Sequence, residues 1–389
     1  MSERWEDKAI ISGVGISRVG RKTGIADLDL TVEASLAAIA DAGLTPADID
    51  GVTSLGETPI TIASQALGID APWSGALGSM GGLLSPIVGA GQAIAAGEAR
   101  HVLVYRTVQM MGGSVAPSDA PPPMEAEQAS DLLTVMGDVS VLLAYHAYGA
   151  PLWLSMHARR HMELYGTTRE QLGWLAINSR TNAALNERAV FKDPLSMDDY
   201  LSSRPISEPF HLLDCDVPID GSIALVLSIA AYAGDTPNPA VRINAFGGAP
   251  GVKGGWWYRD DYPNQASTDA AGMLWSRSEL TPQDVDFAEL YDGFTFLTFA
   301  WLEALGLCGR GEAGPFVEGA TRIALDGQLP LNTYGGQLSA GRMHGYWVLH
   351  EACLQLQGNA GARQIPKKVE TAVAAVGGGP IAGCMLLTT

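Results

Sequence analysis

Apolar residues recur along the chain in short runs that alternate with longer stretches of helical character. Strand-like runs stand at 9–12, 101–105 and 224–228, and alanine-rich amphipathic stretches stand at 30–42 and 86–96. Short apolar runs bounded by glycine or polar turns predict buried strands, whereas apolar positions three and four residues apart predict helices. Strands that alternate with helices predict an α/β fold with a parallel or mixed sheet.

The same pattern occurs twice. Residues 44–52 read Leu-Thr-Pro-Ala-Asp-Ile-Asp-Gly-Val, and residues 280–288 read Leu-Thr-Pro-Gln-Asp-Val-Asp-Phe-Ala. An alanine-rich helix candidate precedes each copy, and the strand candidate at 10–15 has a counterpart at 241–247. Three elements repeated in one order predict two related halves, and a site shared by both is expected near their interface.

The halves are predicted to be residues 1–238 and residues 239–389. The stretch from about 110 to 215 has no counterpart in the second half, so it is predicted to be an insertion, or loop domain, in the first. A Gly-Gly pair at 81–82 precedes the first-half helix, and the pair at 335–336 precedes a helix expected over 344–357. The two Gly-Gly turns therefore predict equivalent strand-to-helix connections.

Composition narrows the classes of function. Hydrophobic residues make up 47% of the chain and charged residues 17%, as in a globular protein, and the formal net charge is −18. This acidity argues against binding to nucleic acid or to an anionic membrane surface. No apolar run is long enough to span a membrane, and the four scattered cysteines form no metal-binding or disulfide pattern. We expect no metal site and a reduced, cytoplasmic setting.

Three groups of motifs resemble one known family. The run at 289–294 reads Glu-Leu-Tyr-Asp-Gly-Phe, and the run at 332–341 reads Asn-Thr-Tyr-Gly-Gly-Gln-Leu-Ser-Ala-Gly. The insertion adds Tyr-Gly-Thr-Thr at 165–168, Asp-Tyr-Leu at 199–201 and Asp-Gly at 220–221. Together they resemble the thiolase superfamily, in its sterol-carrier and lipid-transfer-protein branch. The resemblance implies a thiolase fold: duplicated βαβ-type halves in a layered α-β-α-β-α arrangement.

Two departures from that family concern its chemistry. The turn where thiolases carry a nucleophilic cysteine reads Ser-Met-Gly-Gly at 79–82, and the family's Gly-His-Pro is replaced by Gly-Arg-Met at 341–343. Acyl transfer through a cysteinyl thioester is therefore not expected.

The remaining pattern is similar to the thiolase-like aldolases of steroid side-chain degradation, which lack that cysteine. The resemblance implies a carbon–carbon lyase that cleaves a bulky β-hydroxyacyl-CoA into a ketone and a short acyl-CoA. It implies no cofactor beyond the coenzyme A thioester of the substrate. It also implies a homodimer and a small partner protein of OB-fold and zinc-ribbon character.

Three side chains carry the expected chemistry. Tyr291 is the first candidate for the base or for the group that orients the substrate hydroxyl, and its pKa would have to fall through a nearby Arg342 or a protonated His344. Tyr346 is expected to protonate the enolate carbon or to hold the ketone. His344 itself is an acid, a base or a helix-face residue. A buried tyrosine with a satisfied hydroxyl is the alternative for both phenols.

Further residues are expected to shape the thioester pocket. The backbone N–H groups at the four glycines of the Gly-Gly pairs are candidates for an oxyanion hole, and Asp292 either fixes its loop or takes part in chemistry. Trp256 and Trp257 line an apolar ligand or a subunit contact. The glycines are Gly81, Gly82, Gly335 and Gly336.

Two other functions fit the same residues. A non-catalytic thiolase-like subunit that binds acyl-CoA or holds a partner enzyme would also lack the cysteine and the histidine. An acyl-CoA acyltransferase that uses Cys308 or Cys353 is the third possibility.

Overall fold

The computed structural model describes residues 4–75, 82–111, 145–147, 149–249 and 259–389. Trp256, Trp257 and Gly81 lie outside these ranges. Within them, nine strands form one mixed sheet in the order β3-β2-β4-β7-β1-β8-β11-β10-β9. These strands are β1 (Ala9–Ile16), β2 (Gly51–Ser54), β3 (Trp73–Ser74), β4 (His101–Gln109), β7 (Asp220–Ile229), β8 (Val241–Ala249), β9 (Phe287–Leu290), β10 (Thr371–Gly378) and β11 (Ile381–Thr388).

The strand order shows the predicted duplication. On one side of the sheet centre, β2 is parallel to β4, β4 is antiparallel to β7, and β7 is antiparallel to β1. On the other side, β9 is parallel to β10, β10 is antiparallel to β11, and β11 is antiparallel to β8. The two half-sheets meet where β1 and β8 pair over only Ile10 with Arg242 and Ile11 with Val241. Each half therefore has its own ladder, and a short seam joins them.

The repeated sequence phrase folds in the same way in both halves. It forms the 3-10 turns η2 (Pro46–Asp48) and η8 (Pro282–Asp284). In the first, the Asp48 carboxylate accepts hydrogen bonds from the Thr45 amide at 2.8 Å and from its hydroxyl at 2.6 Å. In the second, Asp284 accepts the same pair from Thr281 at 2.8 and 2.7 Å. Because the aspartate satisfies the turn's own polar groups, the short phrase dictates its conformation locally.

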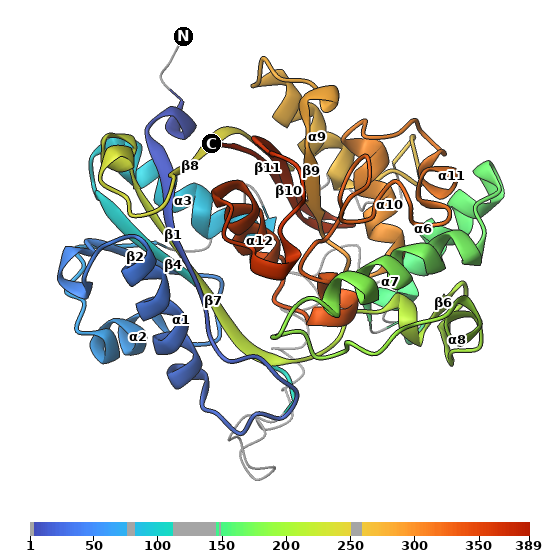
Figure 1. Ribbon diagram of the computed structural model, residues 1–389, viewed down its shortest axis with the longest axis horizontal. Helices are drawn as coiled ribbons and strands as arrows, with labels where there is room; N and C mark the ends of the chain where they lie inside the picture. The colour runs from blue at the N-terminus through green and yellow to red at the C-terminus, as the bar shows by residue number, and fades with distance from the viewer. Residues whose placement is uncertain (1–3, 76–81, 112–144, 148, 250–258) are drawn as a thin grey trace.

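Helices cover the half-sheets in layers, as Figure 1 shows. The helices α1 and α2 pack on one face of the first half-sheet, and α9 packs on β8 and β11 of the second. Between the half-sheets lie α3 and α12, and α12 contacts strands of both. These helices are α1 (Asp27–Asp41), α2 (Ile60–Leu67), α3 (Ser85–Ala96), α9 (Ala266–Ser276) and α12 (Tyr346–Gln357).

Alternation along the strands separates two cores. On β4, Leu103 and Tyr105 belong to the core under α1 and α2, whereas Val102 and Val104 face the larger central core. Side chains of a strand alternate between faces, so one strand lines both layers. The pattern explains why these strands read as continuous apolar runs in the sequence.

The first-half insertion contributes helices on the far side of the second half. Between β4 and β7 the described chain forms α6 (Ala150–Tyr165), α7 (Arg169–Ala183), α8 (Met197–Leu201) and the hairpin of β5 (Pro205–Ser207) and β6 (Phe210–His211). In Figure 1 these green elements lie beside α10 (Thr295–Ala304) and α11 (Ala313–Val317). The insertion therefore packs on the half of the chain to which it does not belong in sequence.

Two element predictions were wrong. The last helix begins at Tyr346 and not at His344, because Gly345 and His344 both have positive φ, which an α-helix excludes. The glycines Gly335 and Gly336 do not open that helix either. They open a separate single turn of π-helix, η9 (Gly336–Ala340), with Gly335 as the residue before it. The strand β11 was not predicted, because only a tight glycine turn separates it from β10.

Candidate active site

Tyr291 stands directly after β9, at the point where the sheet ends. Its amide donates to the Ala375 carbonyl at 2.9 Å, so the β9–β10 pairing holds its backbone. The Tyr291 ring is 9% exposed, and a Cβ on Gly293 would lie 2.6 Å from its Cε1 atom. Only glycine fits below this ring, which explains the glycine in the Tyr-Asp-Gly sequence.

Asp292 anchors the second glycine motif. Its carboxylate accepts hydrogen bonds from the amides of Gln337 at 2.7 Å and Leu338 at 3.4 Å. A Cβ on Gly336 would lie 1.9 Å from Asp292 Oδ2. The carboxylate thus occupies the amides that follow the Gly335-Gly336 pair, which leaves these two N–H groups unavailable to an oxyanion. Burial raises the pKa of Asp292 to about 6.

The end of the insertion runs between the two motif loops. The Asp216 amide donates to the Gly293 carbonyl at 3.1 Å, and the Arg342 amide donates to the Val217 carbonyl at 2.8 Å. The side chains of Asp216 and Arg342 form an ion pair at 3.4 Å. Burial raises the pKa of Asp216 to about 7, although Arg342 opposes that rise. A carboxyl that ionises near neutral pH therefore stands beside the Tyr291 loop.

Arg106 brings a positive charge into the site from the first half. It lies on β4 and is 7% exposed. One terminal nitrogen, Nη1, donates to the Leu55 carbonyl at 2.7 Å. The other, Nη2, contacts Glu57 Oε1 at 3.2 Å and His344 Nδ1 at 2.6 Å. The Arg106 charge acts on the hydroxyl groups of Tyr346 and Tyr291, so one cation serves residues of both halves.

His344 is neutral in this setting. A guanidinium only donates, so Nδ1 accepts the bond from Arg106 and the ring proton resides on Nε2. Burial, Arg106 and Arg342 together lower the pKa of His344 to about 3. The prediction that a protonated His344 lowers the pKa of Tyr291 was therefore wrong, because the charge belongs to the arginines.

Tyr346 is the first residue of α12 and is fully buried. Within the described part of the chain its hydroxyl has no hydrogen-bond partner. Burial raises the pKa of Tyr346, and burial together with Asp216 raises the pKa of Tyr291. The lowered pKa that a tyrosinate base requires is not present, so both phenols are neutral and act first as donors.

The structure thus brings together the second-half residues that the sequence singled out and adds two that it did not. Gly82 lies against the start of β11, where its Cβ would be 3.3 Å from Ile381 Cβ. Arg106 was missed although a charge inside an apolar strand is itself a signal. Asp216 gave no signal, because it is one of several acidic residues in a connecting segment.

The cysteines offer no nucleophile here. Cys353 and Cys384 are buried, and Cys215 and Cys308 are half-buried. Burial raises the pKa of all four thiols, that of Cys215 to about 12. A thiol attacks as its thiolate, so these side chains are poorly suited to acyl transfer.

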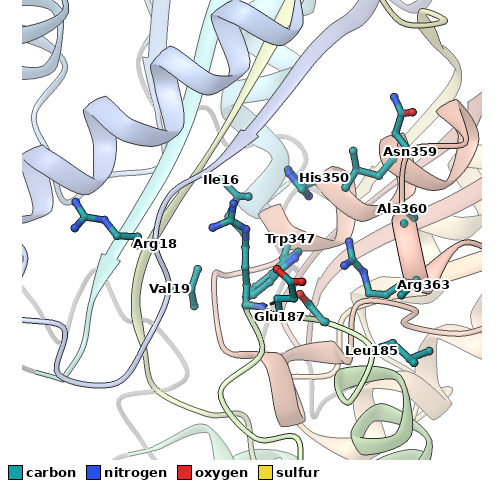
Figure 2. Close-up of a pocket in the computed structure, with 15 residues that line it drawn as sticks. Ile16, Arg18, Val19, Leu185, Glu187, Trp347, His350, Asn359, Ala360 and Arg363 are labelled. Carbon is teal, nitrogen blue, oxygen red and sulfur yellow. Dashed lines mark hydrogen bonds between the residues drawn. The ribbon is translucent and has the colours of Figure 1, made fainter.

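A separate cavity of about 680 Å³ lies along the other side of α12. Figure 2 shows Trp347 and His350 facing it from that helix. Arg18 and Arg363 also line it, but they are paired with Glu33 and Glu351, each at 2.9 Å. None of the predicted site residues that the structure describes lines this cavity, so it is distinct from the cluster around Tyr291 and Tyr346.

Two further searches of the described residues complete the description. They contain no group of three or more His, Cys, Asp or Glu side chains arranged to hold a metal ion. No described helix combines the length and apolar character that crossing a bilayer requires.

The duplicated halves, the central helix pair and the site at their junction define a thiolase-type fold. Comparison with known proteins agrees. The family model "Thiolase C-terminal domain-like" matches residues 257–387. The 17-hydroxy-3-oxo-4-pregnene-20-carboxyl-CoA lyase of Mycobacterium tuberculosis is 35% identical over 370 residues, which are 91% of this chain and 92% of that protein. The steroid side-chain-cleaving aldolase of Thermomonospora curvata is 35% identical over 365 residues, 90% of this chain and 91% of that protein.

A solved structure gives the same result. The structure titled "Ltp2-ChsH2(DUF35) aldolase" superposes with a TM-score of 0.85 at 31% identity, covering 98% of each chain. The chain therefore belongs to the thiolase superfamily, in the branch to which these aldolases also belong.

Proposed function

We propose that this protein is a carbon–carbon lyase that cleaves a β-hydroxyacyl-CoA by a retro-aldol reaction. The substrate is bulky, and a steroid side chain is the class that the two aldolase relatives name. The products are a ketone and a short acyl-CoA. The observation that carries the proposal is the cluster itself: two neutral buried phenols, two arginines and one carboxyl ionising near neutrality, with no thiolate.

Each group has a role in this reaction. The Tyr291 hydroxyl accepts a hydrogen bond from the substrate's β-hydroxyl and orients it, and the Tyr291 O–H donates toward the Asp216 carboxylate, so that the substrate's hydroxyl proton passes by way of Tyr291 to Asp216. The bond between the α and β carbons then breaks, and its electron pair moves to the thioester as an enolate. The β carbon becomes the ketone carbon. Tyr346 supplies the proton that the α carbon gains. Proton exchange with solvent then returns Asp216 and Tyr346 to their starting states.

The reaction needs no acyl-enzyme. The electron pair that breaks the carbon–carbon bond comes from the hydroxyl oxygen, and one proton moves from oxygen to carbon overall. This agrees with the raised pKa values of the four thiols. It also removes the basis for an acyltransferase that uses Cys308 or Cys353.

The proposal includes partners. One superposed structure is titled as an assembly of two proteins, and we propose that this chain also works with a partner protein. The finer form of this proposal is a homodimer that carries a small OB-fold and zinc-ribbon subunit. Light scattering of the purified chain, with and without such a subunit, measures both assemblies. A monomer under both conditions would contradict this part.

The first test is the variant Tyr291→Phe. It keeps the ring on Gly293 but removes the hydroxyl that orients the substrate. We expect turnover of a steroid β-hydroxyacyl-CoA to fall at least about tenfold, the lower range for a general acid or base. Ketone release, measured by liquid chromatography and mass spectrometry, is the readout. A folded variant with an unchanged rate would exclude Tyr291, and wild type that binds the thioester without releasing ketone would favour a binding subunit.

A further inference from the structure

Two buried donors in the site have no acceptor among the residues that the structure describes. Within the described residues, Arg106 Nε and the Tyr346 hydroxyl are both unpartnered and shielded from solvent. Arg106 is 7% exposed and Tyr346 is fully buried. Unsatisfied buried polar groups are rare because each one loses its hydrogen bonds to water on folding. Two in one site indicate that a ligand supplies the missing acceptor.

The two donors belong together although they come from different halves. His344 stands two residues before Tyr346, and its Nδ1 accepts from Arg106 Nη2 at 2.6 Å. The charge of Arg106 also acts directly on the Tyr346 hydroxyl. The guanidinium of β4 is therefore bonded to the segment that begins α12, and Nε and the phenol belong to one cluster.

The rest of the guanidinium is firmly held. Its Nη1 is bonded to the Leu55 carbonyl, and its Nη2 is bonded to Glu57 and His344. His344 has φ +49°, a backbone conformation that residues with a side chain rarely adopt, and it directs Nδ1 at Arg106. Both terminal nitrogens of this planar guanidinium are therefore engaged, and Nε is the nitrogen left without a partner among the described residues. The Nε–H bond is thus free, within the described part of the chain, to donate to a ligand.

We propose that Arg106 is a further catalytic residue whose Nε–H binds the thioester oxygen of the substrate and stabilises the enolate that forms there. The oxygen gains negative charge as the carbon–carbon bond breaks, and a fixed buried donor interacts more strongly with that charge than with the starting carbonyl. The proposal rests on the proposed function and deepens it. It also offers a donor in place of the glycine amides expected from the sequence, of which that of Gly335 is bonded to the Asn332 carbonyl at 2.9 Å.

The position of Tyr346 follows from the same geometry. With Nε–H on the oxygen, the neighbouring phenol is free to give its proton to the α carbon. The resulting tyrosinate would lie beside the Arg106 cation, which favours its charged form. One cation thus serves the enolate before proton transfer and the tyrosinate after it.

The test compares Arg106→Gln and Arg106→Lys with Arg277→Gln. Loss of one fixed donor to a developing oxyanion lowers turnover about 100- to 1000-fold. We expect that loss in kcat for Arg106→Gln, with KM within about threefold. Arg106→Lys keeps the charge but not a donor at Nε, so its loss of kcat should also exceed tenfold. Arg277 is the control arginine, because its ion pair is with the buried Glu6 and not with a residue of the site.

A second measurement separates this inference from the proposed cleavage. Butyryl-CoA in deuterated water exchanges its α protons only through an enolate, and mass spectrometry counts the deuterium gained. Wild type should catalyse this exchange and Arg106→Gln should not. Wild type that neither cleaves nor exchanges would refute the proposed function. Wild type that does both, with folded Arg106 variants that retain kcat and exchange within threefold, would overturn the role of Arg106.

Discussion

At pH 7 three side chains at the centre of the site are neutral: the phenols of Tyr291 and Tyr346 and the imidazole of His344. The carboxyl of Asp216 differs, because its pKa of about 7 lies within the working range. The groups that face it are its ion-pair partner Arg342 and the neighbouring Asp292 and Tyr291. Among these residues, Asp216 is the one whose ionisation a pH profile would report near neutrality.

The first prediction concerns that profile. If Asp216 accepts the hydroxyl proton, kcat/KM should fall below pH 7 as the carboxylate is protonated. In Asp216→Asn this acidic limb should disappear and the plateau should drop at least about tenfold. Rates from pH 5.5 to 8.5 for the two proteins provide the comparison. An identical limb in the folded variant would assign the ionisation to another group, with Asp292 and its pKa of about 6 the next candidate.

Part of the site could be predicted from the order of the sequence motifs. The rest could not, because it depends on burial and on neighbours that are distant in the sequence. Tyr291 and Asp292 were found because they stand in a run after a strand, and the chain folds so that this run ends at the site. The pKa values were not predictable, since they depend on which neighbours the fold supplies. His344 reads as a possible acid in sequence, yet two arginines from distant positions keep it neutral.

Each half depends on a strand that touches its covering helix through glycine. A Cβ on Gly15 of β1 would lie 2.3 Å from the Ala34 carbonyl oxygen of α1. A Cβ on Gly247 of β8 would lie 2.0 Å from the Ala270 carbonyl oxygen of α9. The duplicated elements therefore use the same close approach of backbone to backbone, which explains why both helices are rich in alanine.

The second prediction tests this contact. Gly247→Ala should destabilise the protein by about 1–3 kcal/mol or more, because the added methyl group has no space against α9. Gly272→Ala, in the helix α9 itself, is the matched control, since no atom lies within 4 Å of a Cβ placed there. That variant should be neutral or more stable by about 0.5–1 kcal/mol through helix propensity. Denaturant unfolding measures both, and equal effects would contradict the packing described.

Elements with a clear period were predictable, and elements defined by turns were not. The helix and strand before each Leu-Thr-Pro phrase carry their own apolar pattern, and the phrase carries its own cap. The start of α12 was misplaced by two residues, because His344 has a positive φ and contacts Arg106, which is distant in the sequence. The π-helical turn likewise depends on Asp292, which is 45 positions away from Gln337.

For the molecule as a whole, the net negative charge and the burial of carboxyl groups both disfavour the folded state as the pH rises. The chain has a formal net charge of −18, and several carboxyls lie inside it. The pKa values of Asp216 and Asp292 are about 7 and 6 in the folded protein, against about 3.9 in an unfolded chain. Between these limits the native state binds more protons than the unfolded state, so stability decreases as pH rises.

The third prediction follows from that sign. Lowering the pH from 8 to 6 should raise the free energy of unfolding by about 1–2 kcal/mol, since Asp216 and then Asp292 take up protons. Urea unfolding at each pH gives the value. Asp216→Asn should flatten the slope between pH 8 and 7, because its amide has no proton to gain. A stability that rises toward pH 8 would show that these carboxyls are not buried as described.

The duplicated architecture was the most predictable property of the chain. Local phrases indicate it, and the repeated Leu-Thr-Pro phrase forms equivalent 3-10 turns, η2 and η8, in the two halves. The spatial relation of the halves was not predictable in the same way. It depends on a contact of β1 with β8 and on packing of α12 against both half-sheets, neither of which leaves a pattern in the sequence.

That narrow contact bears on how the enzyme would fail. Arg106 belongs to the first half of the molecule, and His344 and Tyr346 belong to the second half. The ladder that ties the sides together is two residue pairs long. A small separation of β1 from β8 would move the Arg106 guanidinium away from the Tyr346 hydroxyl while each half-sheet stayed folded. Mild heat or dilute urea should therefore abolish catalysis while circular dichroism still reports an intact protein.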